Sequence, residues 1–322
     1  MNFNITEPES KQRLDKFLSL KLKDKTRSQI KKMIKNGLVL INNSPAKVHQ
    51  FLKTKDQITI LKDIETKAET TITEKEKIKI DPKIIFENND FLIIDKPIGI
   101  LVHPTDAGET GTLVDWLYQK YPELETVGEY QNRGGIIHRL DKDVSGVMMV
   151  AKNDQAYYHL KNQFKEREVK KLYLALVYGR ANDDPGEINL PIGRNKDGQF
   201  VAHPRQGKEK FLANDRVAKT KYKVLEYIKD YTLLEIQILT GRTHQIRIHL
   251  SAVGHPILGD QVYKPRKKFL HFLSRRIKVV NPGRIFLHSH KLGFNDLNNN
   301  WVEFESALPK TLTDFLNDQK TK

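Results

Sequence analysis

The sequence GGIIHRLDKDVSG at residues 134–146 places a short polar segment between two apolar ones. Ile136 and Ile137 precede the polar segment, and the apolar run VMMV at residues 147–150 follows it. This pattern predicts a buried strand, a polar loop and a second buried strand. Because two core strands hold such a loop rigidly, its charged side chains are candidates for catalysis or binding. A charged hairpin loop without any function would have the same pattern.

The composition of the chain predicts a protein that binds a polyanion. The 322 residues carry a formal net charge of +15, and 38% of them are hydrophobic, which is enough for a sizeable core. The chain has no cysteine, which excludes disulfides and cysteine-ligated zinc. The sequence has no apolar run of membrane-spanning length and no signal-peptide core, so we expect a cytoplasmic protein with no membrane partner.

Residues 11–61 hold most of the excess positive charge. Residues 11–60 contain 13 Lys and Arg against 3 Asp, a net charge of +10. The apolar residues of the first part recur at helical spacing, as Leu14, Phe17, Leu18 and Leu22. A capping box at residues 26–29 predicts a second helix that Gly37 would end, and strands are expected at 38–42 and 57–61. The segment therefore predicts a small α/β unit with a basic surface.

The rest of the chain predicts a tether followed by an α+β domain. Residues 62–83 carry 12 charges that cancel and no aromatic residue, which is typical of a linker. In residues 84–322, predicted strands predominate and helices interrupt them irregularly, which favours an α+β fold over a doubly wound sheet. The expected elements are a hairpin at 84–94, a helix from Asp154 as N-cap to Phe164, a strand at 171–178, paired strands at 222–228 and 232–239, and a helix at 243–253 with Ile246, Leu250 and Val253 on its buried face.

Four segments of this domain together resemble the RluA-type RNA pseudouridine synthases. In chain order they are DKPIGILVHP at 95–104, HRLDKDVSG at 138–146, KLYLALV at 171–177 and TGRTHQIRIHL at 240–250. The resemblance covers roughly residues 84–295. It implies a mixed, mainly antiparallel sheet with the active cleft across its middle. It also implies an isomerase that converts uridine to pseudouridine in RNA without a cofactor.

The resemblance implies specific roles for four residues. Asp141 would be the catalytic carboxylate, acting either as a nucleophile on C1′ or as a base at C2′. Arg247 would pair with it, because an opposite charge keeps a partly buried carboxylate ionised. The ring of Tyr173 would lie against the flipped base, with its hydroxyl near C5 as a candidate for late proton removal. Arg139 would fill the space that the extruded nucleotide leaves.

Three of these residues also have an interpretation without function. Asp141 could be a salt-bridged turn aspartate, and composition alone would suit Asp143 equally well for the catalytic role. Tyr173 could be a half-buried strand tyrosine, and a helical arginine such as Arg247 is more often a solvated surface residue. The functional assignment therefore depends on the match to the family's segments. Val144 departs from the family, which usually has threonine there.

The basic unit at residues 11–61 resembles the S4 RNA-binding domain, with RLD at 13–15 and RS at 27–28 in its recurring positions. Such a module would contact phosphates and RNA shape rather than read sequence. The candidate contacts of this unit are Arg13, Arg27, Lys31, Lys32 and Lys35. A merely solvated basic face is the alternative interpretation. A second basic run, at residues 264–278, is a further hypothetical RNA contact.

No metal site is expected in this chain. His244, His249 and His255 are spaced by five and six residues, so no two of them lie at the i, i+4 spacing that a helical zinc site uses. The sequence has neither a G-x-G-x-x-G fingerprint nor a P-loop. We therefore expect a monomeric RNA pseudouridine synthase without a cofactor.

The large-subunit ribosomal RNA is the expected substrate, because members with an S4 module usually modify it. Transfer RNA is the rival substrate within the same class. From other classes, the rivals are a non-catalytic RNA-binding factor for ribosome assembly and a metal-dependent nuclease, which the sequence supports less because it shows no convincing carboxylate cluster.

Overall fold

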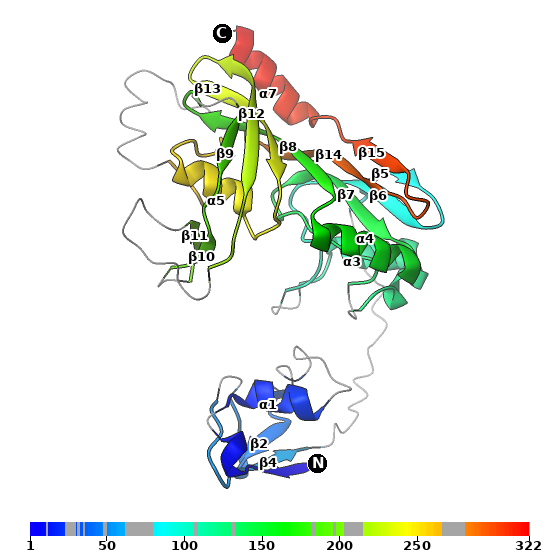
Figure 1. Cartoon of the computed structure of the whole chain (residues 1–322), viewed down its shortest axis with the longest axis vertical. Helices are drawn as coiled ribbons and strands as arrows, with labels where there is room; N and C mark the ends of the chain where they lie inside the picture. Colours follow the sequence, from blue (N-terminus) through cyan, green and yellow to red (C-terminus); the bar gives the residue numbers. More distant parts are fainter. Residues whose placement is uncertain are drawn as a thin grey trace. The chain divides into compact units, whose positions relative to one another are not determined.

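The computed structural model describes residues 1–10, 12–22, 30, 33–34, 36–47, 50–61, 80–105, 109–129, 133–181, 185–195, 198–202, 215–265 and 281–321. The chain divides into two compact units, Met1–Lys77 and Ile78–Lys322 (Figure 1). Several predicted features lie outside the described residues: the capping box at 26–29, the RNA contacts Arg27, Lys31, Lys32 and Lys35, the tether from 62 to 79, and the basic run from 266 onwards.

The smaller unit combines helix α1 with a four-stranded antiparallel sheet in the order β1-β4-β2-β3. Its elements are β1 (Asn2–Asn4), the 3-10 helix η1 (Glu7–Glu9), α1 (Leu14–Lys21), β2 (Val39–Ile41), β3 (Ser44–Pro45) and β4 (Gln57–Ile60). The predicted apolar face of the first helix is confirmed, since Leu14, Phe17, Leu18 and Leu22 are all buried. These four residues form the core of the unit with residues of β2 and β4.

Gly37 and strand β1 are two local features of this unit. Gly37 has a φ of +73°, and the amides of Gly37 and Leu38 donate to the carbonyls of Ile34 and Met33. This is the hydrogen-bond pattern that ends a helix on glycine, as the sequence predicts. Strand β1 was not predicted, because three residues are too few for a hydrophobic alternation. It exists because its backbone pairs with β4, more than fifty residues later in the chain.

The larger unit is built on a nine-stranded mixed sheet in the order β5-β6-β7-β14-β8-β13-β12-β9, with β15 paired to β14. Among the described strands β7 and β14 pair in parallel, whereas their other pairings are antiparallel. The strands are β5 (Lys83–Glu87), β6 (Phe91–Lys96), β7 (Ser145–Ala151), β8 (Lys170–Tyr178), β9 (Gly186–Ile188), β12 (Thr220–Ile228), β13 (Tyr231–Ile238), β14 (Leu287–Asn295) and β15 (Trp301–Glu305). The fold is thus α+β with a mainly antiparallel sheet, as expected.

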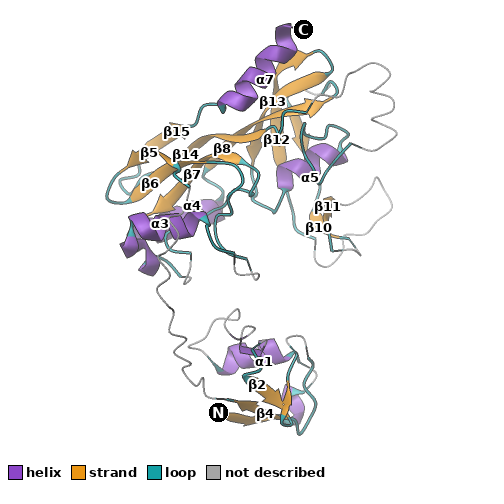
Figure 2. Cartoon of the chain, turned by 180° about the vertical axis from the view of Figure 1, so that it is seen from behind, coloured by secondary structure: helices purple, strands orange, loops and turns teal. Residues whose placement is uncertain are grey.

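The helices of this unit pack against different parts of the sheet. They are α3 (Leu113–Lys120), the 3-10 helix η2 (Pro122–Thr126), α4 (Asp154–Glu166), α5 (Gln245–Ala252) and α7 (Lys310–Thr321). Helices α3 and α4 lie side by side next to β7 (Figures 1 and 2). Helix α5 packs against β12 and against a separate two-stranded ribbon of β10 (Ile192–Arg194) and β11 (Phe200–Ala202).

Glycine is required where β7 meets β14. Gly146 has a φ of +121°, and a Cβ atom there would lie 2.1 Å from the carbonyl oxygen of Ser289. The two strands pair in parallel through this residue. Any side chain would push β14 away from β7, and β14 in turn borders β8. The last glycine of the segment at 134–146 therefore sets how closely the middle strands of the sheet approach.

Three sequence predictions for this unit are corrected. Ile136 and Ile137 do not form a strand; Ile136 makes one isolated bridge to Val150, because the chain turns at once into the polar loop. Helix α4 is capped by Asn153, whose side chain accepts from Ala156 N, and Asp154 is its first helical residue. Val253 is 41% exposed because α5 ends at Ala252, one residue before it.

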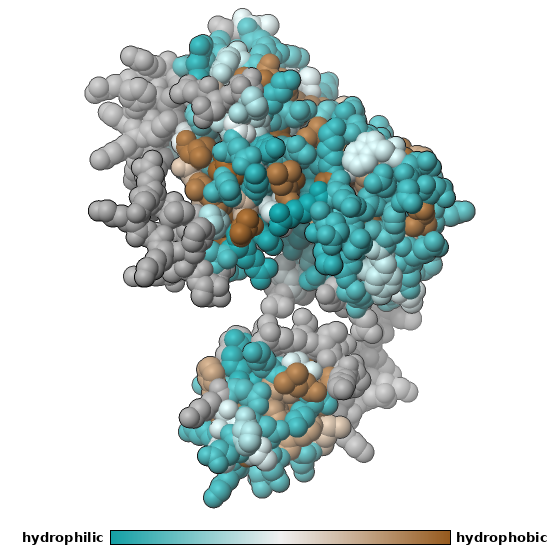
Figure 3. Space-filling model, viewed as in Figure 1, coloured by the Kyte–Doolittle hydropathy of each residue, from teal (hydrophilic) through white to brown (hydrophobic). Residues whose placement is uncertain are grey.

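The predicted hairpin and strand pair are confirmed. β5 pairs with β6, and β12 pairs with β13. On the face seen in Figure 3, the described surface of the larger unit is mainly hydrophilic, with apolar side chains in small separate patches. Among the described residues, no helix combines the length and the apolar composition that crossing a membrane would need.

Candidate active site

Asp141 lies in the polar loop that leads into β7. The amide of Val144 donates to the Asp141 carbonyl at 3.1 Å and closes a turn directly before the strand. The Asp141 side chain is 21% exposed, so its carboxylate is partly shielded from water and still accessible. The strand behind the turn, Ser145–Ala151, is buried at every residue, which anchors the loop. The turn therefore holds Asp141 at the edge of the core.

Lys96 at the end of β6 ties this loop to its neighbour. The Lys96 side chain is fully buried, and its Nζ donates to the carbonyl oxygens of Pro97, Ile100 and Lys142 at 2.8, 3.0 and 3.3 Å. The amide of Gly99 also donates to the Lys142 carbonyl at 2.8 Å. Burial lowers the pKa of Lys96 to about 8. The ammonium thus joins residues 97–100 to the residue that follows Asp141.

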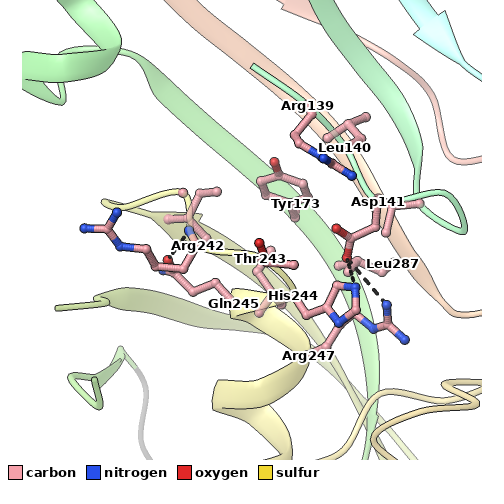
Figure 4. A pocket seen from close by; sticks show the side chains of 14 residues that line it. Arg139, Leu140, Asp141, Tyr173, Arg242, Thr243, His244, Gln245, Arg247 and Leu287 are labelled. Carbon is pink, nitrogen blue, oxygen red and sulfur yellow. Dashed lines mark hydrogen bonds and ion pairs between the residues drawn. The ribbon is translucent and has the colours of Figure 1, made fainter. Parts of the chain in front are cut away.

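Arg247 on α5 links Asp141 to a second, fully buried carboxylate. Its Nε and Nη2 donate to the two oxygens of Asp260 at 2.7 and 2.8 Å, while Nη1 lies 3.5 Å from Asp141 Oδ2 (Figure 4). The backbone amides of Val262 and Tyr263 also donate to Asp260. Such a bidentate pair fixes the guanidinium plane. The arginine that faces Asp141 is therefore immobilised from behind.

Electrostatics at this pair favour the charged forms. Burial acts to raise the pKa of Asp260, yet the hydrogen bonds and charge of Arg247 hold that pKa below its usual value. Burial likewise acts to lower the pKa of Arg247, and Asp260 outweighs it, so the pKa is raised. Both groups are ionised at neutral pH, which keeps a positive charge close to Asp141.

His244 also faces Asp141. It precedes α5 with a left-handed backbone, φ 54° and ψ 22°. Its Nε2 lies 3.9 Å from Asp141 Oδ2, and its Nδ1 lies 3.0 Å from the Tyr263 hydroxyl. Burial lowers the pKa of His244, so the ring is neutral at pH 7. A neutral imidazole with its proton on Nε2 accepts from Tyr263 and presents an N–H toward Asp141.

The backbone of His244 provides a test of strain at the site. His244→Asn is expected to change the free energy of unfolding by less than about 1 kcal/mol, because asparagine tolerates the left-handed region. His244→Val should destabilise the protein by about 1–3 kcal/mol more, since a β-branched residue does not tolerate it. Urea unfolding of both variants measures the difference. Equal stability of the two variants would contradict a strained backbone at this position.

Tyr173 lies at the middle of the sheet, on β8 between β13 and β14. It is buried, and burial raises the pKa of its hydroxyl above the usual value, with a further increase from the charge of Asp141. The hydroxyl is therefore protonated at neutral pH. Tyr173 and Asp141 line a hollow of about 110 Å³, whose wall consists of Arg139, Leu140, Asp141, Val144, Tyr173, Ile238, Gly241, Arg242, Thr243, His244, Gln245, Ile246, Arg247 and Leu287.

Arg139 stands at the rim of this hollow, beyond the Tyr173 ring in Figure 4. It is exposed, and its Nη1 lies 3.4 Å from Nε2 of the buried His103. Burial, together with the charges of Arg133 and Arg139, lowers the pKa of His103 to about 4. The neutral His103 ring can accept a hydrogen bond from Arg139, and this bond holds the Arg139 side chain at the rim.

The structure brings together four of the residues singled out in the sequence: Arg139, Asp141, Tyr173 and Arg247 all line one hollow. Arg13 belongs to the other unit, where its guanidinium makes two hydrogen bonds, of 3.0 and 2.9 Å, to the buried Asp15. These two bonds occupy part of the hydrogen-bond donors of the Arg13 guanidinium.

Sequence reasoning missed the functions of two residues at the site. His244 was considered only as a metal ligand, and Asp260 was not assigned any role. The signal for Asp260 was a carboxylate directly after the apolar Ile257 and Leu258 and the turn residue Gly259. Within the described residues, no group of three His, Cys, Asp or Glu side chains is arranged to hold a metal ion.

The fold and this site define a class of protein. A single accessible carboxylate faces an immobilised arginine, beside a buried aromatic ring and an exposed arginine, and the chain carries a net charge of +15. Such a carboxylate is available for acid–base or nucleophilic chemistry, and the basic composition fits a polyanionic substrate.

The particular family follows from comparison with known proteins. Residues 90–252 match the family described as RNA pseudouridylate synthase, and residues 12–58 match the S4 domain. The chain belongs to the RNA pseudouridylate synthase family, whose members are isomerases that act on RNA. The resemblance of its four sequence segments and of its N-terminal unit is thereby confirmed.

Relatives similar over nearly the whole length support this assignment. The uncharacterized RNA pseudouridine synthase YlyB of Bacillus subtilis is 36% identical, covering 98% of this chain and 97% of its own. The ribosomal large subunit pseudouridine synthase D of Yersinia pestis is 32% identical, covering 99% and 94%. Among solved structures, human RNA pseudouridylate synthase domain containing 4 has a TM-score of 0.55 at 26% identity, covering 74% and 92%.

Proposed function

We propose that this enzyme isomerises specific uridines of large-subunit ribosomal RNA to pseudouridine, with Asp141 as the catalytic carboxylate. The observation that carries the proposal is the contact of Asp141 with Arg247, an arginine that Asp260 immobilises behind it. Relatives named ribosomal large subunit pseudouridine synthase D and C, which are 32% and 31% identical over nearly the whole chain, support this substrate. The S4 match and the basic composition agree with a structured RNA substrate.

Asp141 can act by either of two routes. In one, its oxygen bonds to C1′ as the C1′–N1 bond breaks, the freed uracil turns, and C5 displaces the carboxylate from C1′. In the other, Asp141 removes the C2′ proton as the C1′–N1 bond breaks, which leaves a C1′=C2′ double bond, and it returns that proton to C2′ as C5 joins C1′. Both routes need an oriented carboxylate, and the contact of Arg247 with Asp141 at 3.5 Å can orient it.

We assign two tasks to Tyr173. Its ring lines the hollow and can pack against the base, while its hydroxyl is the candidate acceptor of the C5 proton in the last step. A phenol must first lose its own proton for this, and burial together with the negative charge of Asp141 opposes that loss. On both routes the Asp141 carboxylate is regenerated when C5 joins C1′, before the C5 proton leaves. Its negative charge therefore still opposes the ionisation of Tyr173 at the stage where a base is needed.

Tyr173→Phe separates the two tasks. The ring remains, so we expect RNA affinity to change by less than about threefold, whereas the rate of pseudouridine formation should fall by about 10²-fold or more if the hydroxyl is the base. Single-turnover rates and filter-binding affinities measure the two quantities. Tyr173→Leu, which also loses the ring, serves as the comparison. A phenylalanine variant with the wild-type rate would remove the hydroxyl from the mechanism.

The remaining assignments concern RNA binding and the state of the protein. We propose that Arg139 occupies the place of the flipped nucleotide and that the S4 unit, including Arg13, Arg27, Lys31, Lys32 and Lys35, contacts RNA phosphates. The domains would be residues 11–61 and 84–322, joined by a tether at 62–83 that raises the local concentration of RNA at the catalytic unit. We further propose a monomeric, cytoplasmic enzyme without a cofactor.

The experiment that tests the substrate is a pseudouridine map of ribosomal and transfer RNA. It compares cells that lack the protein with the same cells complemented by it. A large-subunit site that disappears and returns with the protein supports the proposal. A site in transfer RNA instead would overturn the substrate, and a complete map in both strains would favour the RNA-binding factor without catalysis.

A further inference from the structure

A second, larger hollow adjoins the active site. Its volume is about 440 Å³, within the range that small-molecule sites occupy. It shares a wall with the catalytic hollow, because five residues line both: Arg139, Tyr173, Ile238, Gly241 and Arg242. Whatever binds in the second hollow is therefore a direct neighbour of the group that reacts at Asp141.

The charge of this second hollow is positive. Five basic side chains line it, namely Arg139, Lys165, Arg167, Lys171 and Arg242, and none of the described lining residues is acidic. Arg242 lies close enough to Arg167 and Arg216 that burial and these two charges lower its pKa. Like charges gathered at one place repel each other, so an anion bound among them would be stabilised by all.

Lys171 is the most unusual of these residues. It is buried, with 8% of its surface exposed, and it lies on β8 two residues before Tyr173. Among the described residues, none accepts a hydrogen bond from its ammonium or pairs with it as a carboxylate. The Lys171 Nζ lies over the ring of Phe164, 5.1 Å from the ring centroid. Burial lowers the pKa of Lys171 to about 8, so an anion bound beside its ammonium would favour the charged form.

The neutral side chains beside Lys171 do not supply the missing anion. His138 donates nothing from Nε2, which accepts a hydrogen bond from the amide of Met149 at 3.0 Å. Burial and the charge of Lys171 lower the pKa of His138 to about 3, so its ring stays neutral. The His138 ring stacks on Phe164 at 4.8 Å and forms part of the floor. The hollow is thus a basic site, and the described residues that line it supply no anion.

We propose that the second hollow binds a backbone phosphate of the RNA, on a nucleotide adjacent to the reacting uridine. Lys171 holds the phosphate from the floor, and Arg167 and Arg242 hold it from the sides. Because the two hollows share a wall, a phosphate in this hollow would lie next to the base beside Tyr173. The inference rests on the proposed function for its ligand, because the polyanion that reaches Asp141 is RNA. It assigns Lys171 a role in positioning the substrate and no role in the chemical step.

The test compares the full-length wild-type protein with Lys171→Met and Lys171→Arg. Methionine keeps the length and the packing on Phe164 without the charge, and arginine restores the charge. The probe is a transcript of large-subunit ribosomal RNA, and filter binding is measured across a series of salt concentrations. Single-turnover pseudouridine formation on the same transcript is measured in parallel. Lys223→Met is the matched control, because Lys223 is exposed on β12 and lines neither hollow.

We expect Lys171→Met to weaken RNA binding roughly tenfold at low salt and to reduce the salt slope of log K by about 0.7, the loss of one phosphate contact. The maximal rate at saturating RNA should stay near the wild-type value, because a phosphate contact is the same before and during the reaction. Lys171→Arg should restore the salt slope of log K. Lys223→Met should weaken RNA binding far less than Lys171→Met does. A wild-type slope in Lys171→Met would overturn the phosphate site.

The outcomes for this site and for the proposed function are distinguishable. If the wild-type protein modifies the transcript and Lys171→Met equals it in slope and affinity, the phosphate site is wrong and the function stands. If the wild-type protein binds the transcript without modifying it, but Lys171→Met shows a smaller salt slope, the phosphate site stands and the ribosomal substrate is wrong. If Lys171→Met does not fold, Arg167→Asn replaces it, since Arg167 is exposed with a φ of 65° that asparagine tolerates. An unchanged slope in Arg167→Asn would then overturn the site.

Discussion

Asp141→Asn is expected to abolish pseudouridine formation, with a decrease of at least about 10⁴-fold in the single-turnover rate. An amide can neither attack C1′ nor take up a proton from C2′, so both routes fail together. The side chain keeps its shape, and Arg247 keeps its two hydrogen bonds to Asp260, so the free energy of unfolding should change by less than about 1 kcal/mol. A pseudouridine map of complemented cells and unfolding in urea give the two readouts.

Asp143→Asn is the matched control for this prediction. Both residues are aspartates of the same loop, and composition alone did not separate them. Asp143 is exposed and does not line the catalytic hollow, so its variant should keep activity within a few-fold of wild type. If Asp141→Asn retained activity, or if Asp143→Asn lost as much, the assignment of the catalytic carboxylate would be wrong.

The largest effect on stability is expected at the buried pair of Arg247 and Asp260. Asp260→Asn should lower the free energy of unfolding by about 3–5 kcal/mol, because it leaves the Arg247 charge buried beside a neutral amide. Arg247→Met should lower the free energy of unfolding by a similar amount, since it leaves the Asp260 charge buried without its partner. The double variant should be more stable than the sum of the two losses predicts, by about 2–3 kcal/mol, because neither charge then remains unpaired.

The asparagine in this double variant preserves the acceptor for the amides of Val262 and Tyr263, which isolates the charge pair. All three variants should lose activity, because each disturbs the arginine that faces Asp141. A control of the same chemistry is Glu226→Gln, which breaks an exposed ion pair with Lys320 and should cost less than about 1 kcal/mol. Strict additivity of the two single losses would show that Arg247 and Asp260 do not stabilise each other.

The pair also predicts a pH dependence of stability. The pKa of Asp260 is lower in the folded chain than in the unfolded chain, so the stabilisation from this group is fully present above the ordinary aspartate pKa. It decreases as the pH falls below about 4 and approaches the lowered value. The difference in unfolding free energy between wild type and Asp260→Asn should therefore shrink with acidification from pH 5. A difference that grows on acidification would reverse the sign of the coupling.

Hydrophobic patterning was sufficient to predict much of the fold. Strands β12 and β13 and the hairpin of β5 and β6 were predictable because each pair is joined by a short turn. Strand β1 and the ribbon of β10 and β11 were not, because three-residue strands carry too little pattern and depend on partners elsewhere in the chain. The predicted N-cap of α4 was wrong by one residue. Asn153 and Asp154 are both good capping residues, and only the backbone geometry selects between them.

The sequence by itself determined the class of the enzyme and the identity of Asp141, Tyr173 and Arg247 as candidates, because these residues stand in short segments that resemble a known family. Only the tertiary structure decided what surrounds them. Asp260 pairs with Arg247, thirteen residues earlier in the chain, and Lys171 lines a basic hollow that is formed by residues far apart in the sequence. Residue spacing along a chain reports which side chains share one element, whereas partners from different elements meet only where the packing of the sheet brings them together.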